Sequence, residues 1–180
     1  MAEARFDFGL ATRLDADAIG EPGQRTFRLL IRSGSSSALI WMEKQQLLAL
    51  AVAMEQVLAQ VAPGEARRAE LLASPAAASA QDFPLNPTVE FKVGQLQLGH
   101  DAANEQFQII ANDDETAEDG PPTFTVRTGY QAARRLCSQI TSVASAGRPL
   151  CPLCGEAMGP ESHHCPPERI PPHIANGYIH

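Results

Sequence analysis

Hydrophobic and polar residues alternate along several short segments of this chain, and each such segment predicts a β-strand. The clearest cover residues 26–32, 106–112 and 123–127, and the apolar stretch 38–42, which corresponds to 123–127, predicts a further strand. Two longer segments instead place apolar residues three and four positions apart, which predicts helices from 44 to about 61 and from 129 to about 146. Strands and helices that alternate in this way predict an α+β protein.

The predicted elements follow the same order twice. An extended stretch, a strand carrying one phenylalanine, a further strand and a helix occur in each half of the chain. This pattern predicts duplicated β-β-β-α units, from about residue 5 to 62 and from about 88 to 147, within a domain over 1–147. A linker rich in proline and alanine joins them over 63–87. We expect their strands to form one antiparallel sheet, or two packed sheets, with both helices covering apolar faces.

The remaining segment, 148–180, predicts a zinc-knuckle-like tail. Cys151, Cys154, His163 and Cys165 form a C-x2-C-x8-H-x-C arrangement there. Three thiolates and one imidazole are a standard tetrahedral ligand set for Zn²⁺, and four protein ligands leave no position for a reacting water. We therefore expect a structural zinc ion.

Two alternatives to this assignment stay open. His164 lies next to His163 and could replace it as the fourth ligand. The pair Cys151 and Cys154 could also be a redox-active CxxC motif, but such a motif is expected near a βαβ pattern, at the start of a helix. Here the pair follows the end of a predicted helix, which favours zinc.

A second candidate site is the loop between the first two strands of the first unit. Pro22 and Gly23 suit the centre of a type II turn, and a plain turn is the simpler interpretation. The functional interpretation is that Glu21, Gly23 and Arg25 contact a ligand or a partner, as loop residues held by rigid strands often do. The corresponding loop over 100–104 lacks these residues, so only the first unit would contact the ligand or partner.

The amino-acid composition disfavours several classes of function. The 180 residues are 44% hydrophobic and 19% charged, which is typical of a folded core, and the net charge of −7 repels nucleic-acid backbones. No signal-peptide pattern and no apolar run of membrane-spanning length occurs in the sequence. The fourth cysteine, Cys137, falls on the apolar face of the second predicted helix and has no disulfide partner to expect, so we expect a reducing cytoplasm.

No motif of a known catalytic class occurs in the sequence. We therefore expect a non-enzymatic binding or adaptor module with a protein partner. One alternative is an enzyme or small-ligand binder that uses the loop from Glu21 to Arg25. Another is nucleic-acid binding through the zinc tail, which the lack of aromatic residues between Cys151 and Cys165 disfavours. The apolar surface of the two helices also leaves a homodimer open.

Several short motifs together resemble a bacterial domain-of-unknown-function family, number 3090, whose members are uncharacterised proteins with zinc-knuckle-like tails. The motifs are GEPGQRTF at 20–27, EKQQ at 43–46, GRPLCPLCG at 147–155, HHCP at 163–166 and NGY at 176–178. The resemblance covers nearly the whole chain and implies a metal-binding role for the cysteines and histidine of the tail. It implies no activity. The chain departs from the family in the residues 167–175, which separate Cys-Pro from Asn-Gly-Tyr.

Overall fold

A computed structural model describes residues 4–21, 24–61, 83–115 and 120–146. Within these residues the chain forms seven strands and two helices. In chain order they are β1 (Phe6–Leu10), β2 (Arg13–Ile19), β3 (Thr26–Ser33), β4 (Ser36–Met42), α1 (Lys44–Val61), β5 (Val89–Asp101), β6 (Gln106–Asp113), β7 (Phe124–Gly129) and α3 (Tyr130–Ser145).

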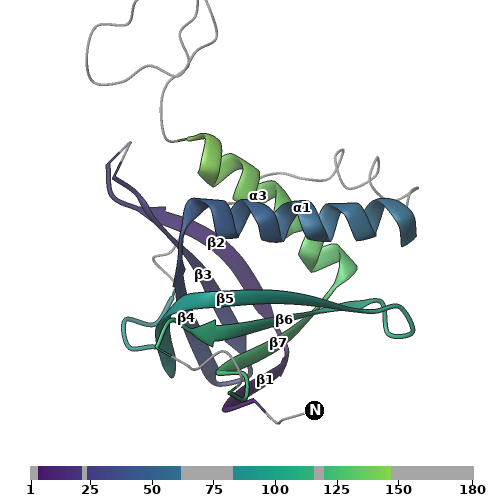
Figure 1. The fold of residues 1–180 in the computed structure, drawn as a ribbon, viewed down its shortest axis with the longest axis horizontal. Coiled ribbons are helices and arrows are strands. Elements are labelled where there is room, and N and C mark those ends of the chain that lie inside the picture. Colours follow the sequence, from purple (N-terminus) through teal and green to yellow (C-terminus); the bar gives the residue numbers. More distant parts are fainter. Residues whose placement is uncertain (1–3, 22–23, 62–82, 116–119, 147–180) are drawn as a thin grey trace, which may run out of the picture.

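All seven strands belong to one mixed sheet with the order β1-β7-β6-β5-β4-β3-β2 (Figure 1). Within each group of three, β2-β3-β4 and β5-β6-β7, neighbouring strands are antiparallel. The two groups join through the parallel pair β4 and β5, and β1 adds to β7 as a second parallel pair. The result is an α+β architecture on a single sheet.

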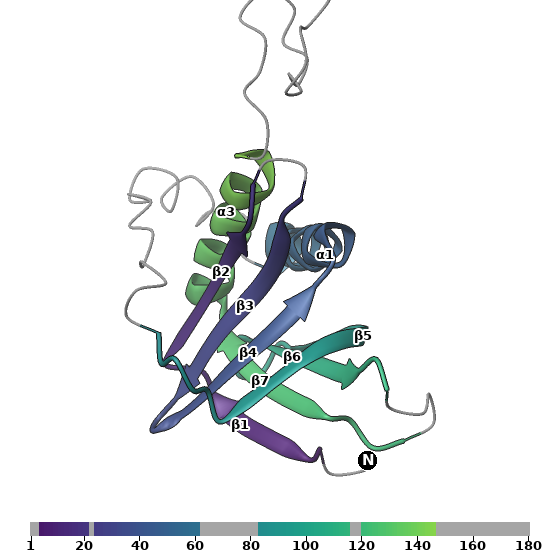
Figure 2. The ribbon, with the colours of Figure 1, turned by 90° about the vertical axis from the view of Figure 1, so that its left-hand side faces the viewer.

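The sheet is strongly curved, so that its first and last strands approach each other (Figure 2). Only two residues, Ala11 and Thr12, separate β1 from β2 in the chain. The amide of Ala11 donates to the carbonyl of Arg127 in β7, and the amide of Thr12 donates to the carbonyl of Arg32 in β3, both at 2.8 Å. This short connection therefore joins β1 and β2, the first and last strands of the sheet, and stabilises the curved shape.

Both helices pack on the same face of the sheet, and α3 crosses α1 at an angle and contacts it (Figures 1 and 2). Successive residues of a strand point to opposite faces, so each strand contributes every second side chain to this core. The largest fully buried side chains of the core are Leu29, Ile31, Ile40, Met42, Leu47, Met54, Leu58, Phe107, Ile109, Phe124 and Leu136. A smaller cluster, formed by Leu30, Leu39 and Phe83 with Trp41, lies on the opposite face.

The helix α3 also covers the open edge of the sheet at β2. The amide of Ala16 in β2 donates to Oε1 of Gln139 in α3 at 3.3 Å. Nε2 of the same glutamine donates to Oδ1 of Asp15 at 2.9 Å, and Asp15 is only 8% exposed. Unpaired strand edges promote association with other strands, and here a helix side chain supplies the missing partner.

The predictions of the α+β class, of both helices and of the four strands at 26–32, 38–42, 106–112 and 123–127 are confirmed. In β5 the register shifts between Val93 and Gln95. The β-β-β-α order indeed occurs twice, but duplication itself stays a prediction. Phe83, which lies within the expected linker, packs on the outer cluster.

Two expectations need correction. The sheet is mixed and not antiparallel, because α1 and the segment after it carry the chain back across the sheet, so β5 runs parallel to β4. The strand β1 was also not expected. Its residues Phe6, Phe8 and Leu10 alternate with Asp7 and Gly9, which is a strand pattern, but the pattern is short.

Candidate functional site

The structure describes only two of the residues predicted to form a site. Glu21 and Arg25 lie in the connection between β2 and β3, whereas Gly23 lies outside the described residues. The proposed zinc ligands Cys151, Cys154, His163 and Cys165, and the alternative ligand His164, lie outside them as well. Within the described part of the chain, no group of three or more His, Cys, Asp or Glu side chains could hold a metal ion.

The connection between β2 and β3 has the geometry of a tight turn. The amide of Gln24 donates to the carbonyl of Glu21 at 2.9 Å, which is the hydrogen bond that closes a four-residue β-turn. Gly20 enters the turn at φ = +108°, and a Cβ atom at this position would lie 2.7 Å from the carbonyl oxygen of Gln24. The turn interpretation of this loop therefore accounts for its backbone.

The side chains of Glu21 and Arg25 do not converge. Glu21 is exposed and Arg25 is half-buried, and no ion pair joins them among the contacts of the described residues. Nε of Arg25 is buried without a hydrogen-bond partner in this part of the chain. One guanidinium donor is thus available near the turn, but no carboxylate faces it.

This turn lies at the same end of the molecule as the last residues of α3. In Figures 1 and 2 the tip of the β2–β3 hairpin and the C-terminal end of α3 both point away from β1 and β7. The description ends at Ala146, just after α3. The last described residue of the chain therefore lies at the hairpin end of the sheet.

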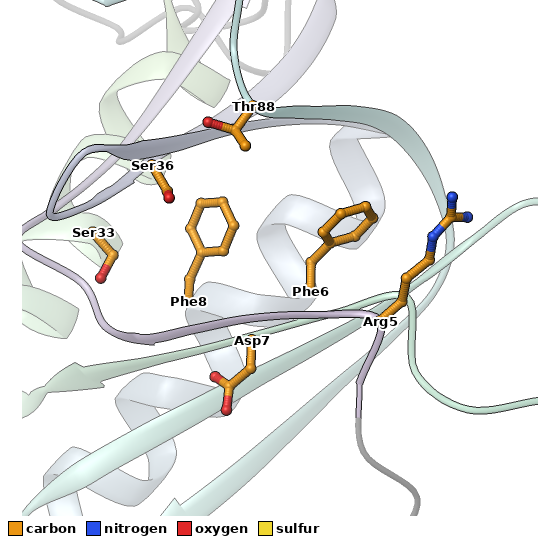
Figure 3. A pocket seen from close by; sticks show the side chains of 7 residues that line it. All are labelled: Arg5, Phe6, Asp7, Phe8, Ser33, Ser36 and Thr88. Atoms are coloured by element: carbon orange, nitrogen blue, oxygen red, sulfur yellow. The ribbon is translucent and has the colours of Figure 1, made fainter.

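A hollow of about 430 Å³ lies at the opposite end of the curved sheet, next to β1. It is lined by Arg5, Phe6, Asp7 and Phe8, by Ser33 and Ser36 from the ends of β3 and β4, and by Thr88 before β5. Figure 3 shows the rings of Phe6 and Phe8 projecting from β1 on the side of the hydroxyl groups, while the carboxylate of Asp7 points the other way.

The strand that borders this hollow is at the end of the sheet. β1 pairs with β7 on one side, and no strand of the described chain pairs with its other edge. Near its end the hydroxyl of Ser33 donates to the carbonyl of Leu10 at 3.0 Å, which ties β1 to β3 across the gap. Farther towards the start of β1, Phe6, Asp7 and Phe8 line the hollow.

The hollow combines aromatic and polar surface. Phe8 is only 9% exposed and contacts Phe124, with ring centroids 4.8 Å apart, so its ring is fixed by the core. The guanidinium of Arg5 lies 5.2 Å from the centroid of the Phe6 ring, in cation–π contact at the rim. A ligand with an apolar group next to an anionic group would fit here, because the apolar group could contact the rings and the anionic group could contact the Arg5 guanidinium.

Sequence reasoning missed this site because it missed β1. The alternation of Phe6, Asp7 and Phe8 was the available signal, but nothing local indicates that the strand joins β7, more than a hundred residues away in the chain. In the sequence, Ser33, Ser36 and Thr88 look like ordinary turn residues. The curvature of the sheet is what brings them next to Phe6 and Phe8.

The described fold and hollow define a class: an α+β protein with a curved mixed sheet, two helices on one face and an edge strand beside a partly aromatic hollow. A family model described as protein of unknown function (DUF3090) matches residues 6–165. The chain belongs to this family, as its motifs indicated. Searches of curated proteins and of solved structures found no significant match.

The family match extends through the Cys and His segment and ends at Cys165. It carries no statement about metal. Among the described residues, neither helix is long and apolar enough to cross a lipid bilayer.

Proposed function

We propose that this protein is a binding module that takes an extended segment of a protein partner along the free edge of β1, while its tail is held by a structural zinc ion. The free edge next to a hollow is the observation that carries the proposal. A strand at the end of a sheet offers unpaired amide and carbonyl groups, and adding a peptide strand there is a recurring mode of recognition.

The side chains around the edge indicate the chemistry of the partner segment. The rings of Phe6 and Phe8 offer apolar surface, and hydroxyl groups of Ser36 and Thr88 lie across the hollow (Figure 3). Arg5 at the rim is exposed and has no carboxylate within ion-pair distance among the described residues. A segment with an apolar residue next to an acidic one fits this arrangement.

The zinc part of the proposal rests on the donor set. Cys151, Cys154, His163 and Cys165 supply three sulfur atoms and one nitrogen, the types of ligand that a closed zinc site uses. When bound, the ion would cross-link a segment that is rich in proline and poor in large apolar residues. Its role would be stability, because a closed ligand set offers no site for a substrate.

We also propose a reducing compartment such as the cytoplasm. The thiol of Cys137 is free, and thiolate ligands for zinc must likewise stay reduced. A ligand-binding or enzymatic role for Glu21 and Arg25 is the second candidate, and the buried Nε of Arg25 favours it. We rank it lower because Glu21 does not face that group.

The test replaces Arg5 by Glu in the tagged full-length protein and compares it with wild type in cells that normally express it. Arg135→Glu is the matched control, because Arg135 is an exposed arginine on α3, far from the hollow. Quantitative mass spectrometry of co-purifying proteins should find a protein that wild type and the control retain and that Arg5→Glu loses.

A synthetic peptide from that protein should then bind wild type, with amide shifts in NMR spectra concentrated in β1. Equal recovery of every protein by wild type and Arg5→Glu contradicts the proposal, and so do peptide-induced shifts that avoid β1.

A further inference from the structure

The exposed face of α1 is almost free of charge. This helix has 18 residues, and only Lys44 and Glu55 carry charged side chains. The other positions of α1 that face solvent hold uncharged side chains: Gln45, Ala49, Val52, Gln56, Ala59, Gln60 and Val61. Val52 is 50% exposed, although it lies in the middle of the helix.

Such a face is unusual for a helix in contact with water. The solvent side of a surface helix normally carries charged and polar residues, whereas the centres of protein interfaces are depleted of charge. The other helix differs in polarity and not in charge: α3 exposes a single charged residue, Arg135, but its remaining exposed positions are all polar, whereas α1 exposes alanine and valine. The solvent face of α1 therefore has the composition of an interface.

The two charges on α1 indicate what covers it. Lys44 and Glu55 are about three helical turns apart, so both lie on the same flank of the helix. Both are exposed, and neither has an ion-pair partner among the described residues. A positive and a negative side chain thus lie on one flank of the uncharged face, the flank nearer α3, where the Glu55 carboxylate is also close to the Cys137 thiol.

A second copy of the chain satisfies both charges at once. When two helices pack antiparallel about a two-fold axis, the same flank of each helix lies on the same side of the interface. The N-terminal part of that flank in one copy then lies opposite its C-terminal part in the other copy. Around a centre near Ala49 and Leu50, Lys44 of one copy lies opposite Glu55 of the other, and the reverse pair forms at the other end. Parallel packing about a two-fold axis would place these flanks on opposite sides of the interface, so the charges would not meet.

We propose that this protein forms a two-fold symmetric homodimer through antiparallel packing of α1 against α1, with Val52 near its centre and the charges of Lys44 and Glu55 paired across the interface. A hollow of about 290 Å³ beside the helix, between Ala49 and Ala53 of α1 and Leu96 and Leu98 of β5, adds apolar surface at its margin. This interface is separate from the edge of β1.

The test measures the mass of the full-length protein by analytical ultracentrifugation over a range of concentrations at low ionic strength. Wild type should be a dimer, and Val52→Asp should be a monomer because a carboxylate then enters the centre of the interface. Each single reversal, Lys44→Glu or Glu55→Lys, should weaken the dimer by about tenfold, because symmetry places two repulsive contacts in each dimer.

The double variant, which combines Lys44→Glu with Glu55→Lys, decides the geometry. Its dissociation constant should return to within about threefold of wild type, since opposite charges again face each other. Glu105→Lys serves as the control, because Glu105 is exposed at the far end of β5 and β6 and its reversal should change nothing.

A protein that stays monomeric at every concentration overturns the proposal, and so does a dimer that Val52→Asp leaves intact. A double variant no tighter than the single reversals refutes the antiparallel arrangement. Circular dichroism confirms that each variant is folded; should Val52→Asp unfold, the three charge variants alone decide the outcome.

Discussion

Gly20 is the residue whose identity the backbone constrains most clearly. Its φ of +108° lies in a region that other residues rarely adopt, and a side chain would meet the carbonyl of Gln24 at 2.7 Å. Gly34, in the turn between β3 and β4, also has a positive φ of +56°, but no atom lies within 4 Å of where its Cβ would be. A side chain at Gly34 would therefore meet only the conformational penalty, whereas a side chain at Gly20 would also clash with the backbone.

We expect Gly34→Ala to lower the free energy of unfolding by about 1 kcal/mol and Gly20→Ala to lower it by about 2–3 kcal/mol. The difference reflects the clash with Gln24 and the larger conformational penalty at φ = +108°, which lies outside the left-handed helical region that Gly34 occupies. Urea denaturation followed by circular dichroism measures both values. Equal losses for the two variants would show that the β2–β3 turn relaxes to accept a side chain.

Cys137 shows how far sequence alone reaches at this scale. Helical periodicity placed it on a core face, and the structure confirms this, with 2% of the residue exposed and Sγ donating to the carbonyl of Ala51 at 3.6 Å. Burial raises the pKa of the Cys137 thiol to about 12, with a further contribution from the nearby Glu55 carboxylate. The thiol is therefore protonated and unreactive at neutral pH.

At the scale of elements, the contact between α3 and the edge of β2 depends on Gln139. Its side chain bonds both the amide of Ala16 and the carboxylate of Asp15, which is largely buried. Arg13 also bonds Asp15, so the carboxylate keeps one partner when the glutamine is removed. The amide of Ala16 would lose its partner.

We expect Gln139→Ala to cost about 1–3 kcal/mol of stability, because it leaves a partly buried amide unsatisfied. Gln131→Ala on the same helix is the control, since Gln131 is exposed and its loss should change stability by less than about 0.5 kcal/mol. Hydrogen exchange should also show faster exchange at Ala16 in the first variant. Unchanged protection there would contradict the role assigned to Gln139.

At the scale of the whole molecule, the zinc assignment makes a prediction about all four thiols. Freshly purified protein should contain one zinc per chain, and a thiol reagent should react slowly with every cysteine. A strong chelator should release the metal and expose three reactive thiols, those of Cys151, Cys154 and Cys165. Cys137 should react only after denaturation, because its thiol is buried.

Two variants make this assay specific. Cys137→Ala should remove only the thiol that needs denaturation, whereas Cys154→Ser should abolish stoichiometric zinc. Elemental analysis and thiol counting together measure the outcome. Protein without metal, or three thiols that react before any chelator is added, would refute a closed zinc site.

The sequence by itself determined the elements whose signal is local. Periodicity is a property of neighbouring residues, so the helices α1 and α3 and the core position of Cys137 could be predicted. The turn between β2 and β3 was predicted for the same reason, since glycine and proline act within a few residues.

Only the tertiary structure decided how these elements combine. Pairing of β1 with β7 and of β4 with β5 joins residues far apart in the chain, and no local pattern encodes strand direction or neighbour. The hollow beside Phe6 and Phe8 arises from the curvature of the sheet. The exposed face of α1 is set by the side of the helix that packs on the core. Both depend on long-range packing, so no pattern in the sequence indicated the hollow, and sequence reasoning left a homodimer open without locating the face that would form it.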